Sequence, residues 1–330
     1  MSEPKPFVGI SSCLMGEMVR YDGGHKASST CLGPLNRALR WVGMCPEVGA
    51  GFGTPRPPIY LVREQDSVLA LNSESMKTCQ EAIIHYARTQ HEKLANLSGF
   101  VLRTRSPSCG KASVVITNSF LEAKDFALNQ NASPDANTNK GALGNGVFCQ
   151  YLLEHFPHLP LIEDVELRDT QACYHFLVRV LAYQNLKSLP TKPAIMHLQR
   201  FHAEHKYLLL AHDEASYRVM GKLVAESKSE TVSHTLVQYQ ELLTKALSKR
   251  AEKGGHLNTL YHMQGYFKQV PDKNIRSCVG KAIEAYGLGK CELGSVLELV
   301  FCASEQAGIA YLLGQKYLHY YRYAAKYFEH

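Results

Sequence analysis

Short apolar runs alternate with helical stretches over the first half of the chain. The runs are bounded by Gly, Pro and Ser, which is typical of strands buried in a parallel sheet. The predicted strands are Phe7–Ser11, Trp41–Met44, Gly99–Thr104, Ser113–Thr117 and Leu159–Glu163, and the predicted helices are Gly33–Arg40, Ser73–Ala95, Gly146–His155 and Tyr174–Leu186. The alternation predicts an α/β layered domain with a mainly parallel sheet. The Asn- and Gly-rich stretch Asn129–Gly146 predicts a long exposed loop.

The pattern changes at residues 188–193, where the sequence SLPTKP places two prolines among polar residues and predicts a linker. Beyond it, apolar residues recur at three- and four-residue steps, as in FHAEHKYLLLAH and HTLVQYQELLTKAL. This period is typical of helices. We therefore expect two domains: an α/β domain at residues 1–187 and a smaller all-α domain at residues 194–330.

Length and composition favour an intracellular protein with two cores. The chain has 330 residues, of which 45% are hydrophobic, enough for two buried cores. Its start, MSEPKP, has no apolar stretch after a basic patch, so we expect no secretory signal. No uncharged apolar run approaches the roughly 20 residues that a membrane helix needs. In a cytoplasmic chain the ten cysteines would stay reduced and bind metal, react or pack.

Positive charge and tyrosine are concentrated in the second half. Residues 191–330 hold 18 Lys and Arg against 13 Asp and Glu, and 12 of the 18 tyrosines. A basic surface interleaved with aromatic rings suits RNA. The alternative is a mildly basic helical bundle whose tyrosines line its core. Basic residues with polar or aromatic neighbours in the sequence are expected to be exposed and are the candidate phosphate contacts. They are Lys206, Arg218, Lys222, Lys249, Arg250 and Lys268.

Three cysteines follow predicted strands. Cys13, Cys45 and Cys109 each lie in the loop that leaves such a strand, and these loops converge on one crevice in a parallel sheet. Three thiolates with no obvious fourth suit an iron–sulfur cluster that leaves one iron open for a ligand. Alone, each cysteine would be read as a small buried hydrophobe, but their shared polar surroundings argue against that. The spacing is not that of a zinc finger, and GAGFG is not a dinucleotide fingerprint.

Polar residues surround each of these cysteines. Glu47 lies two residues past Cys45, and Ser106 and Ser108 precede Cys109. The loop after Cys13 carries three candidate substrate contacts: the cation Arg20, the hydroxyl of Tyr21 and the carboxylate of Asp22. A fourth candidate is the cation Arg56, which lies on a stiff segment between two prolines.

Together these motifs resemble a known family. The segments SSCLMG, VRYDGGHK, CPEVGAGFGTPRPP and RSPSCG resemble, in that order, the thiouracil desulfidase family over roughly residues 7–165. The second half, with FHAEHKYLLLAHD, HMQGYF and YLLGQKYL, resembles an uncharacterised helical domain often fused to it. The fused form is similar to bacterial desulfidases that remove sulfur from 4-thiouridine in tRNA. Val19 stands where some relatives have a cysteine, and GFGT replaces a common proline.

The resemblance implies a cofactor and a set of residue roles. A [4Fe–4S] cluster would be held by Cys13, Cys45 and Cys109. Glu47 and a serine, Ser106 ahead of Ser108, would take the places of the catalytic polar groups. The implied reaction is a hydrolysis without redox change, in which Glu47 deprotonates water and sulfide leaves.

Three functional hypotheses remain open at this point. The leading one is a cytoplasmic tRNA 4-thiouridine desulfidase whose helical half grips RNA, with no membrane and no obligate protein partner. The second is a desulfidase of free 2- or 4-thiouracil, in which the helical half serves oligomerisation or stability. The third is a non-catalytic iron–sulfur sensor or RNA-binding regulator. Glu47 favours an enzyme, because a sensor needs no general base, and the basic, Tyr-rich half favours tRNA.

Overall fold

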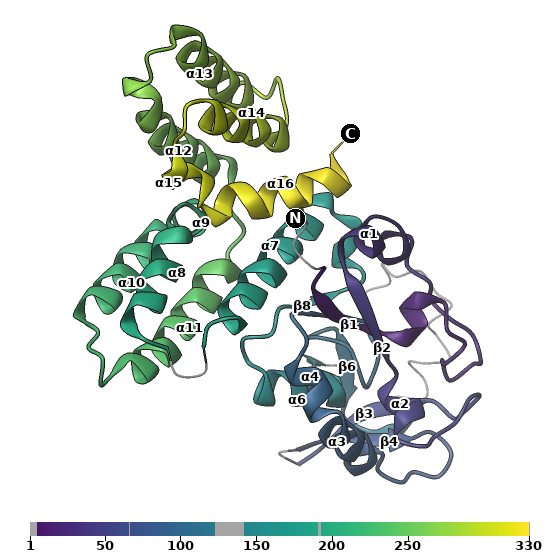
Figure 1. Ribbon diagram of the computed structural model, residues 1–330. Coiled ribbons are helices and arrows are strands. Elements are labelled where there is room, and N and C mark those ends of the chain that lie inside the picture. The colour runs from purple at the N-terminus through teal and green to yellow at the C-terminus, as the bar shows by residue number, and fades with distance from the viewer. Residues whose placement is uncertain (1–4, 66, 123–141, 191–192, 330) are drawn as a thin grey trace. The chain divides into compact units, whose positions relative to one another are not determined.

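The computed structural model describes residues 5–65, 67–122, 142–190 and 193–329 (Figure 1). The chain forms two compact units, Met1–Ala172 and Cys173–His330. Helix α7 (Thr170–Lys187) starts at this division, so most of it belongs to the helical unit. The expected linker at 188–193 follows α7, and residues 191–192 of it lie outside the described residues.

The first unit is built on a four-stranded parallel sheet. Its strands are β1 (Phe7–Ser11), β2 (Arg40–Met44), β5 (Phe100–Leu102) and β8 (Leu161–Glu163), in the order β2-β1-β5-β8. All three neighbouring pairs are parallel. The α/β class and four of the five predicted strands are therefore confirmed. The chain places β2 on one side of β1 and β5 on the other, which opens a crevice at the carboxyl ends of these strands.

The central strand is buried on both faces, as its apolar sequence predicts. Val8 and Ile10 on one face have no exposed surface, and Gly9 and Ser11 on the other face are also buried. Phe100 of β5 packs edge-on against Phe148 with ring centroids 5.6 Å apart. A side chain at Gly9 would lie 2.2 Å from the Phe100 ring. Glycine at this position therefore allows β5 to pair closely with β1.

A second, mixed sheet corrects the placement of the fifth predicted strand. Strand β6 (Val114–Thr117) exists, but it pairs with β3 (Ile59–Glu64) and β7 (Ala142–Gly144) rather than with the parallel sheet. Strand β4 (Ser67–Asn72) completes the order β4-β3-β6-β7. Strands β3 and β4 were not predicted. Most of the expected loop Asn129–Gly146 lies outside the described residues, and its described end forms β7.

Of the three helices predicted in this unit, the one at Gly146–His155 is confirmed to within one residue, and the other two are shorter than predicted. The helices of this unit are α1 (Asn36–Ala38), α2 (Pro46–Gly49), α3 (Gln80–Thr89), α4 (His91–Ala95) and α6 (Val147–His155). The predicted helix Ser73–Ala95 begins only at Gln80. The side chain of Asn72 accepts hydrogen bonds from the backbone N–H groups of Glu74 and Ser75. This turn competes with helix formation over the first residues.

The second unit is all-α, as predicted. Apart from α7, its helices are α8 (Ile195–Glu204), α9 (Lys206–His212), α10 (Glu214–Glu226), α11 (Val232–Ser248), α12 (Lys253–Gln264), α13 (Lys273–Gly287), α14 (Leu293–Gln306), α15 (Ala310–Leu313) and α16 (Lys316–Phe328), with a 3-10 turn η5 (Gly265–Gln269). Every residue from Tyr207 to His212 in α9 is buried. None of the described helices is long and apolar enough to cross a membrane.

Five of the twelve tyrosines in this half lie in the core. Tyr207, Tyr239, Tyr317, Tyr320 and Tyr321 are almost fully buried. For these five residues, the alternative that tyrosines line the bundle core is the correct one.

Two buried histidines and one half-buried histidine join these tyrosines in one network. His212 bonds through Nε2 to the hydroxyl of Tyr321 at 2.9 Å, and His256 bonds through Nδ1 to that of Tyr317 at 2.9 Å. The ring of His175 stacks on His212 with centroids 5.6 Å apart. Burial lowers the pKa of His175 and of His256 to about 4, and that of His212 to about 3. The three imidazoles are therefore neutral in the folded protein at pH 7.

We expect the helical unit to lose stability as pH falls from about 7 to about 5. Unfolding restores the ordinary histidine pKa, so the unfolded state binds more protons in this window, at up to about 2 kcal/mol per histidine near pH 5. Urea unfolding followed by far-UV circular dichroism, which reports mainly on helices, should show the loss. The fluorescence of Trp41 in β2, the chain's only tryptophan, should report a smaller loss in the α/β unit. Replacing the exposed His262 (His262→Gln) should change neither signal; an equal pH dependence in both units would contradict the assignment.

Candidate active site

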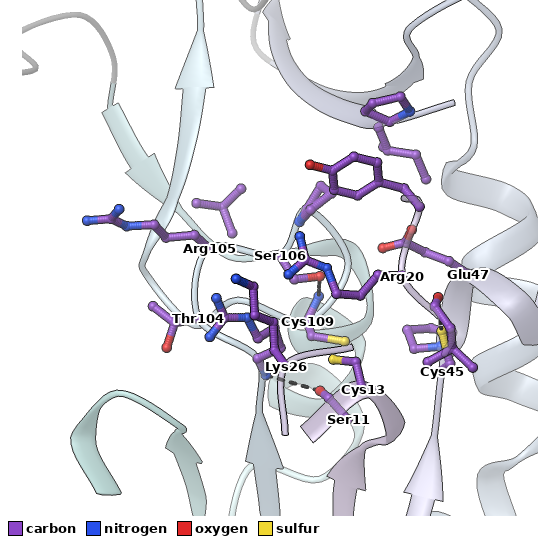
Figure 2. Close-up of a pocket in the computed structure, with 18 of the residues that line it drawn as sticks. Ser11, Cys13, Arg20, Lys26, Cys45, Glu47, Thr104, Arg105, Ser106 and Cys109 are labelled. Atoms are coloured by element: carbon purple, nitrogen blue, oxygen red, sulfur yellow. Dashed lines mark hydrogen bonds between the residues drawn. The ribbon is translucent and has the colours of Figure 1, made fainter. Parts of the chain in front are cut away.

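The three strand-end cysteines line one cavity of about 380 Å³. Cys13 follows β1, Cys45 follows β2, and Cys109 lies in the loop after β5. Figure 2 shows the sulfur atoms of Cys13 and Cys109 pointing toward one another, with Cys45 beside them. The structure thus brings together residues that are far apart in the sequence, because their strands are neighbours in the parallel sheet.

Local backbone geometry holds each cysteine in place. Cys13 lies in the 3-10 turn η1 (Ser12–Met15), directly after β1. Cys45 is the N-cap residue of α2 and has extended backbone angles, as expected of a residue before Pro46. Each thiol therefore lies at a short, stiff junction between a strand and a turn.

The loop that carries Cys109 is cross-linked by its own polar groups. The hydroxyl oxygen of Ser106 accepts hydrogen bonds from the backbone N–H of Ser108 at 3.3 Å and of Cys109 at 3.1 Å. The backbone of Gly146 donates to the carbonyl of Gly110, and a Cβ at Gly146 would lie 2.5 Å from the carbonyl carbon of Ser108. Only glycine permits this approach, which packs the loop against the start of α6.

Burial makes the three thiols poor nucleophiles. It raises the pKa of Cys13 to about 11, raises that of Cys45, and raises that of Cys109 well above its ordinary value. The other cysteines of the trio add to the increase for Cys13 and Cys109. A catalytic cysteine nucleophile has a lowered pKa instead. Such thiols give up their protons only when a strongly binding cation compensates for the burial of charge, which is the situation of a metal ligand.

The donor set fits a cluster better than a single ion. No group of three or more His, Cys, Asp and Glu side chains in the described part of the chain is placed to hold one metal ion. An iron–sulfur cubane bridges thiolates that stand farther apart than the ligands of one ion. Among the described residues that line the cavity, the three cysteines are the only thiols and no histidine joins them.

Glu47 is held from both sides at the base of the cavity. Arg56 donates to Oε2 through Nε at 2.8 Å and through Nη2 at 2.7 Å, and the Ser108 hydroxyl donates to Oε1 at 2.8 Å. The Arg56 side chain is only 4% exposed and also donates to the carbonyl of Gly53. Arg56 was predicted as a substrate contact, but its donors reach Glu47 and the loop 53–54, so it orients the carboxylate.

The two serines differ in what they face. Ser108 has no exposed surface and bonds Glu47, whereas Ser106 lines the cavity. The hydroxyl oxygen of Ser106 accepts two backbone bonds, and its own proton can still be donated into the cavity.

Two acidic residues at the end of β8, Glu163 and Asp164, were not identified from the sequence. Asp164 binds the guanidinium of Arg103 and accepts bonds from the N–H and hydroxyl of Thr104, both at 2.8 Å. Glu163 is buried and accepts bonds from the Lys111 backbone and the Ser113 hydroxyl. Glu163 is the last residue of the predicted strand and Asp164 follows it directly, so the rule that located the cysteines could have found them.

The mouth of the cavity carries positive charge and aromatic rings. Arg20 and Tyr21, both predicted, line it, while Asp22 forms an exposed ion pair with Arg20 at 3.4 Å and does not. Lys26, Tyr60 and Arg105 also line the cavity and were not predicted (Figure 2).

Arg105 has a strained backbone, with φ of +59°. Its N–H donates to the hydroxyl of Ser113. A non-glycine residue held in this region is often found at binding sites.

The six candidate phosphate contacts fall into two groups. Five are exposed and Lys206 is half-buried. Arg218, Lys222 and Lys249 each form an ion pair with an acidic side chain, at 2.6, 3.8 and 2.5 Å. Neither Lys206 nor Lys268 forms an ion pair with a described residue; the Lys206 ammonium lies 5.2 Å from the ring centroid of Tyr207. Arg250, the sixth candidate, is exposed and has an interaction partner, so it belongs with the first group.

Comparison with known proteins identifies the family of the first unit. Residues 8–164 match the family model described as 2-thiouracil desulfurase. The uncharacterized protein YbbK of Bacillus subtilis (strain 168) is 33% identical over 108 residues, which cover 31% of this chain and 71% of that protein. The chain belongs to the 2-thiouracil desulfurase family. The family is named for the removal of sulfur from 2-thiouracil, so this chain is assigned to enzymes that act on carbon–sulfur bonds.

The desulfurase unit is followed by a region with a match of its own. Residues 206–322 match a model described as a protein of unknown function, DUF1722. The uncharacterized protein YbgA of Escherichia coli (strain K12) is 29% identical over 146 residues, which cover 43% of this chain and 85% of that protein. The solved structure of the [4Fe-4S]-dependent thiouracil desulfidase TudS is 24% identical, with a TM-score of 0.37, and the match covers 50% of this chain and 94% of TudS.

Proposed function

We propose that this desulfurase removes sulfur from 4-thiouridine in tRNA, leaving uridine and sulfide. The observation that carries the proposal is the cavity in which three thiols of raised pKa, the buried Cys13 and Cys109 and the half-buried Cys45, meet an oriented carboxylate under a positively charged mouth. The thiols supply a cofactor site, the carboxylate a general base, and the mouth a contact for phosphate.

A [4Fe–4S] cluster is the cofactor that the donor set supports best. Cys13, Cys45 and Cys109 would hold it, and with three protein ligands one iron stays open. When bound, the cluster would supply a Lewis acid with affinity for the soft thiocarbonyl sulfur.

The residues of the chain account for the remaining chemistry. Glu47 takes a proton from the water that attacks C4 of the base, and Arg56 and Ser108 fix the direction of its carboxylate. Ser106 lies in the cavity and donates its proton toward the developing negative charge. C4 gains the oxygen of water and loses its sulfur as sulfide, so no electrons are transferred.

This arrangement favours an enzyme over a sensor. A sensor needs its cluster ligands but no buried carboxylate with both oxygens held in one orientation. Orienting Glu47 requires burying Arg56 and Ser108, and such preorganisation serves a reaction rather than simple cluster binding.

The mouth of the cavity favours a nucleotide over a free base. Lys26 and Arg105 form no ion pair with a described acidic side chain, and Tyr21 and Tyr60 add aromatic surface to the same cavity. Free thiouracil carries no phosphate for these cations, whereas a nucleotide within RNA does.

We expect each of Cys13→Ala, Cys45→Ala and Cys109→Ala to lose the cluster and the activity together. Anaerobically reconstituted wild-type protein should hold about four irons and four acid-labile sulfides per chain. Iron and sulfide analysis with the visible absorption spectrum measures the loss. Cys278 is exposed, and Cys278→Ala should retain full loading. Full iron content in any of the three variants would remove that residue from the ligand set.

Glu47→Gln should keep the cluster and lose activity. Removal of a general base lowers kcat by a factor of about 10² or more, while the absorption spectrum and iron content stay unchanged. Glu64→Gln at the end of β3 serves as the control and should turn over normally. If Glu47→Gln kept near-normal kcat, the proton would have to be taken by another group.

The substrate is tested by comparing 4-thiouridine-containing tRNA with free 4-thiouracil. We expect the double variant Lys26→Gln, Arg105→Gln to lose about tenfold in kcat/KM on tRNA, the value of a charge-assisted bond to phosphate, and little on the free base. Activity on tRNA should fall as salt rises, and activity on the free base should not. Arg37→Gln, an exposed change outside the cavity, is the control. Efficient turnover of free 4-thiouracil with none on tRNA would replace this proposal by the free-base one.

A further inference from the structure

Three tyrosines form a cluster that reaches the surface of the helical unit. The rings of Tyr266 in η5 and Tyr311 in α15 are stacked, with centroids 5.2 Å apart and planes at 15°. Tyr207 in α9 lies beneath, edge-on to Tyr311 at 6.4 Å. We call these three residues the tyrosine platform.

The platform differs from the buried tyrosines around it. Tyr207 is 1% exposed, but Tyr266 and Tyr311 are 40% and 39% exposed. The side chain of Tyr266 interacts with those of both Tyr207 and Tyr311. The stacked pair of Tyr266 and Tyr311 offers ring surface to solvent.

The segments that carry the platform contain no acidic residue. Residues 205–212, 253–271 and 306–316 include four lysines, Lys206, Lys253, Lys268 and Lys316, and no Asp or Glu. Lys206 and Lys268 form no ion pair with any residue that the structure describes, and Lys316 is 3.9 Å from Glu204. Aromatic surface with excess positive charge around it complements a polyanion that bears flat rings.

We propose that the tyrosine platform stacks unpaired bases of single-stranded RNA, with Lys206 and Lys268 contacting the flanking phosphates. The proposal rests on the RNA substrate proposed above and names where the helical unit meets it. Single-stranded RNA fits better than a duplex, because bases in a duplex are stacked on each other and present no free face. It fits better than an acidic peptide, which would use the lysines but not the stacked rings.

The test measures the Kd of the full-length protein for fluorescein-labelled RNA by anisotropy. The probes are a single strand of about 12 nucleotides and the duplex of the same sequence. In the double variant Tyr266→Ala, Tyr311→Ala, we expect the Kd for the single strand to rise about tenfold, from the loss of base stacking, and the Kd for the duplex to change little. Tyr266→Phe, Tyr311→Phe keeps the rings and should bind as the wild type does. Leu288→Ala, which shortens another exposed apolar side chain, is the control for surface change.

Each other outcome overturns the platform in a defined way. If the Kd of the Tyr266→Ala, Tyr311→Ala variant is unchanged, or if its affinity falls equally for the single strand and the duplex, the platform does not stack unpaired bases. A loss in the Phe variant as large as in the Ala variant assigns the effect to the hydroxyls. Tighter binding of polyglutamate than of RNA, abolished by the Ala variant, makes the site one for an acidic protein. If the wild type binds no RNA and does not desulfurate tRNA, the proposed function itself fails; if it does both and the Ala variant binds equally well, only the platform fails.

Discussion

The site depends on one constraint: the three thiols that lie after neighbouring strands are difficult to ionise, because each is wholly or largely removed from water. Burial raises the pKa of all three thiols; Cys45 adds to the increase for Cys13, and both Cys13 and Cys45 add to that for Cys109. Without a cation the thiols are stable only in their neutral form, so their ionisation would require a bound cation. The parallel sheet makes this possible, because strand order β2-β1-β5 places the thiols together on stiff junctions. Loading the site and ionising its ligands are therefore one coupled event.

Two acid–arginine pairs flank this cavity and serve different ends. The Glu47–Arg56 pair is buried, and it fixes a carboxylate at the base of the cavity. The Asp164–Arg103 pair holds a guanidinium whose charge lowers the pKa of Cys13, partly offsetting the effect of burial. The Arg56 guanidinium is bound by the Glu47 carboxylate and by oxygens of Gly53 and Thr54, which is how a buried charge is tolerated. The Arg103 side chain is 31% exposed and pairs with Asp164. Lys26 and Arg105, which line the same cavity, form no ion pair with a described acidic side chain.

Loops that leave the carboxyl ends of parallel strands meet at one crevice, and this strand-end rule explains which parts of the site could be predicted from the sequence. It located the three cysteines because each follows a short apolar run, and it would have located Asp164 had it been applied to the last strand. It could not show that Arg56 turns inward to Glu47, since that depends on a loop closing over nine residues. The β3–β4 hairpin was not predicted, because its turn lacks Gly and Pro. Strand β6 was predicted, but its sheet was not, because an apolar run does not identify the strand with which it pairs. Tyrosine content was the weakest guide, because a buried tyrosine and one that contacts RNA look alike in composition.

The net charge of the helical unit, like its tyrosine content, does not show which side chains are available to a ligand; their ion pairs in the structure do. An excess of five positive charges in residues 191–330 says little, because Arg218, Lys222 and Lys249 lie against acidic side chains that cancel much of their attraction for phosphate. What matters is where positive charge lacks an opposing acid within a Debye length. Beside the stacked rings, Lys206 and Lys268 form no ion pair with any described residue, whereas Lys316 lies 3.9 Å from Glu204. The packing of α9, η5 and α15, which no period in the sequence reveals, therefore concentrates a weak average charge into a surface that RNA could recognise.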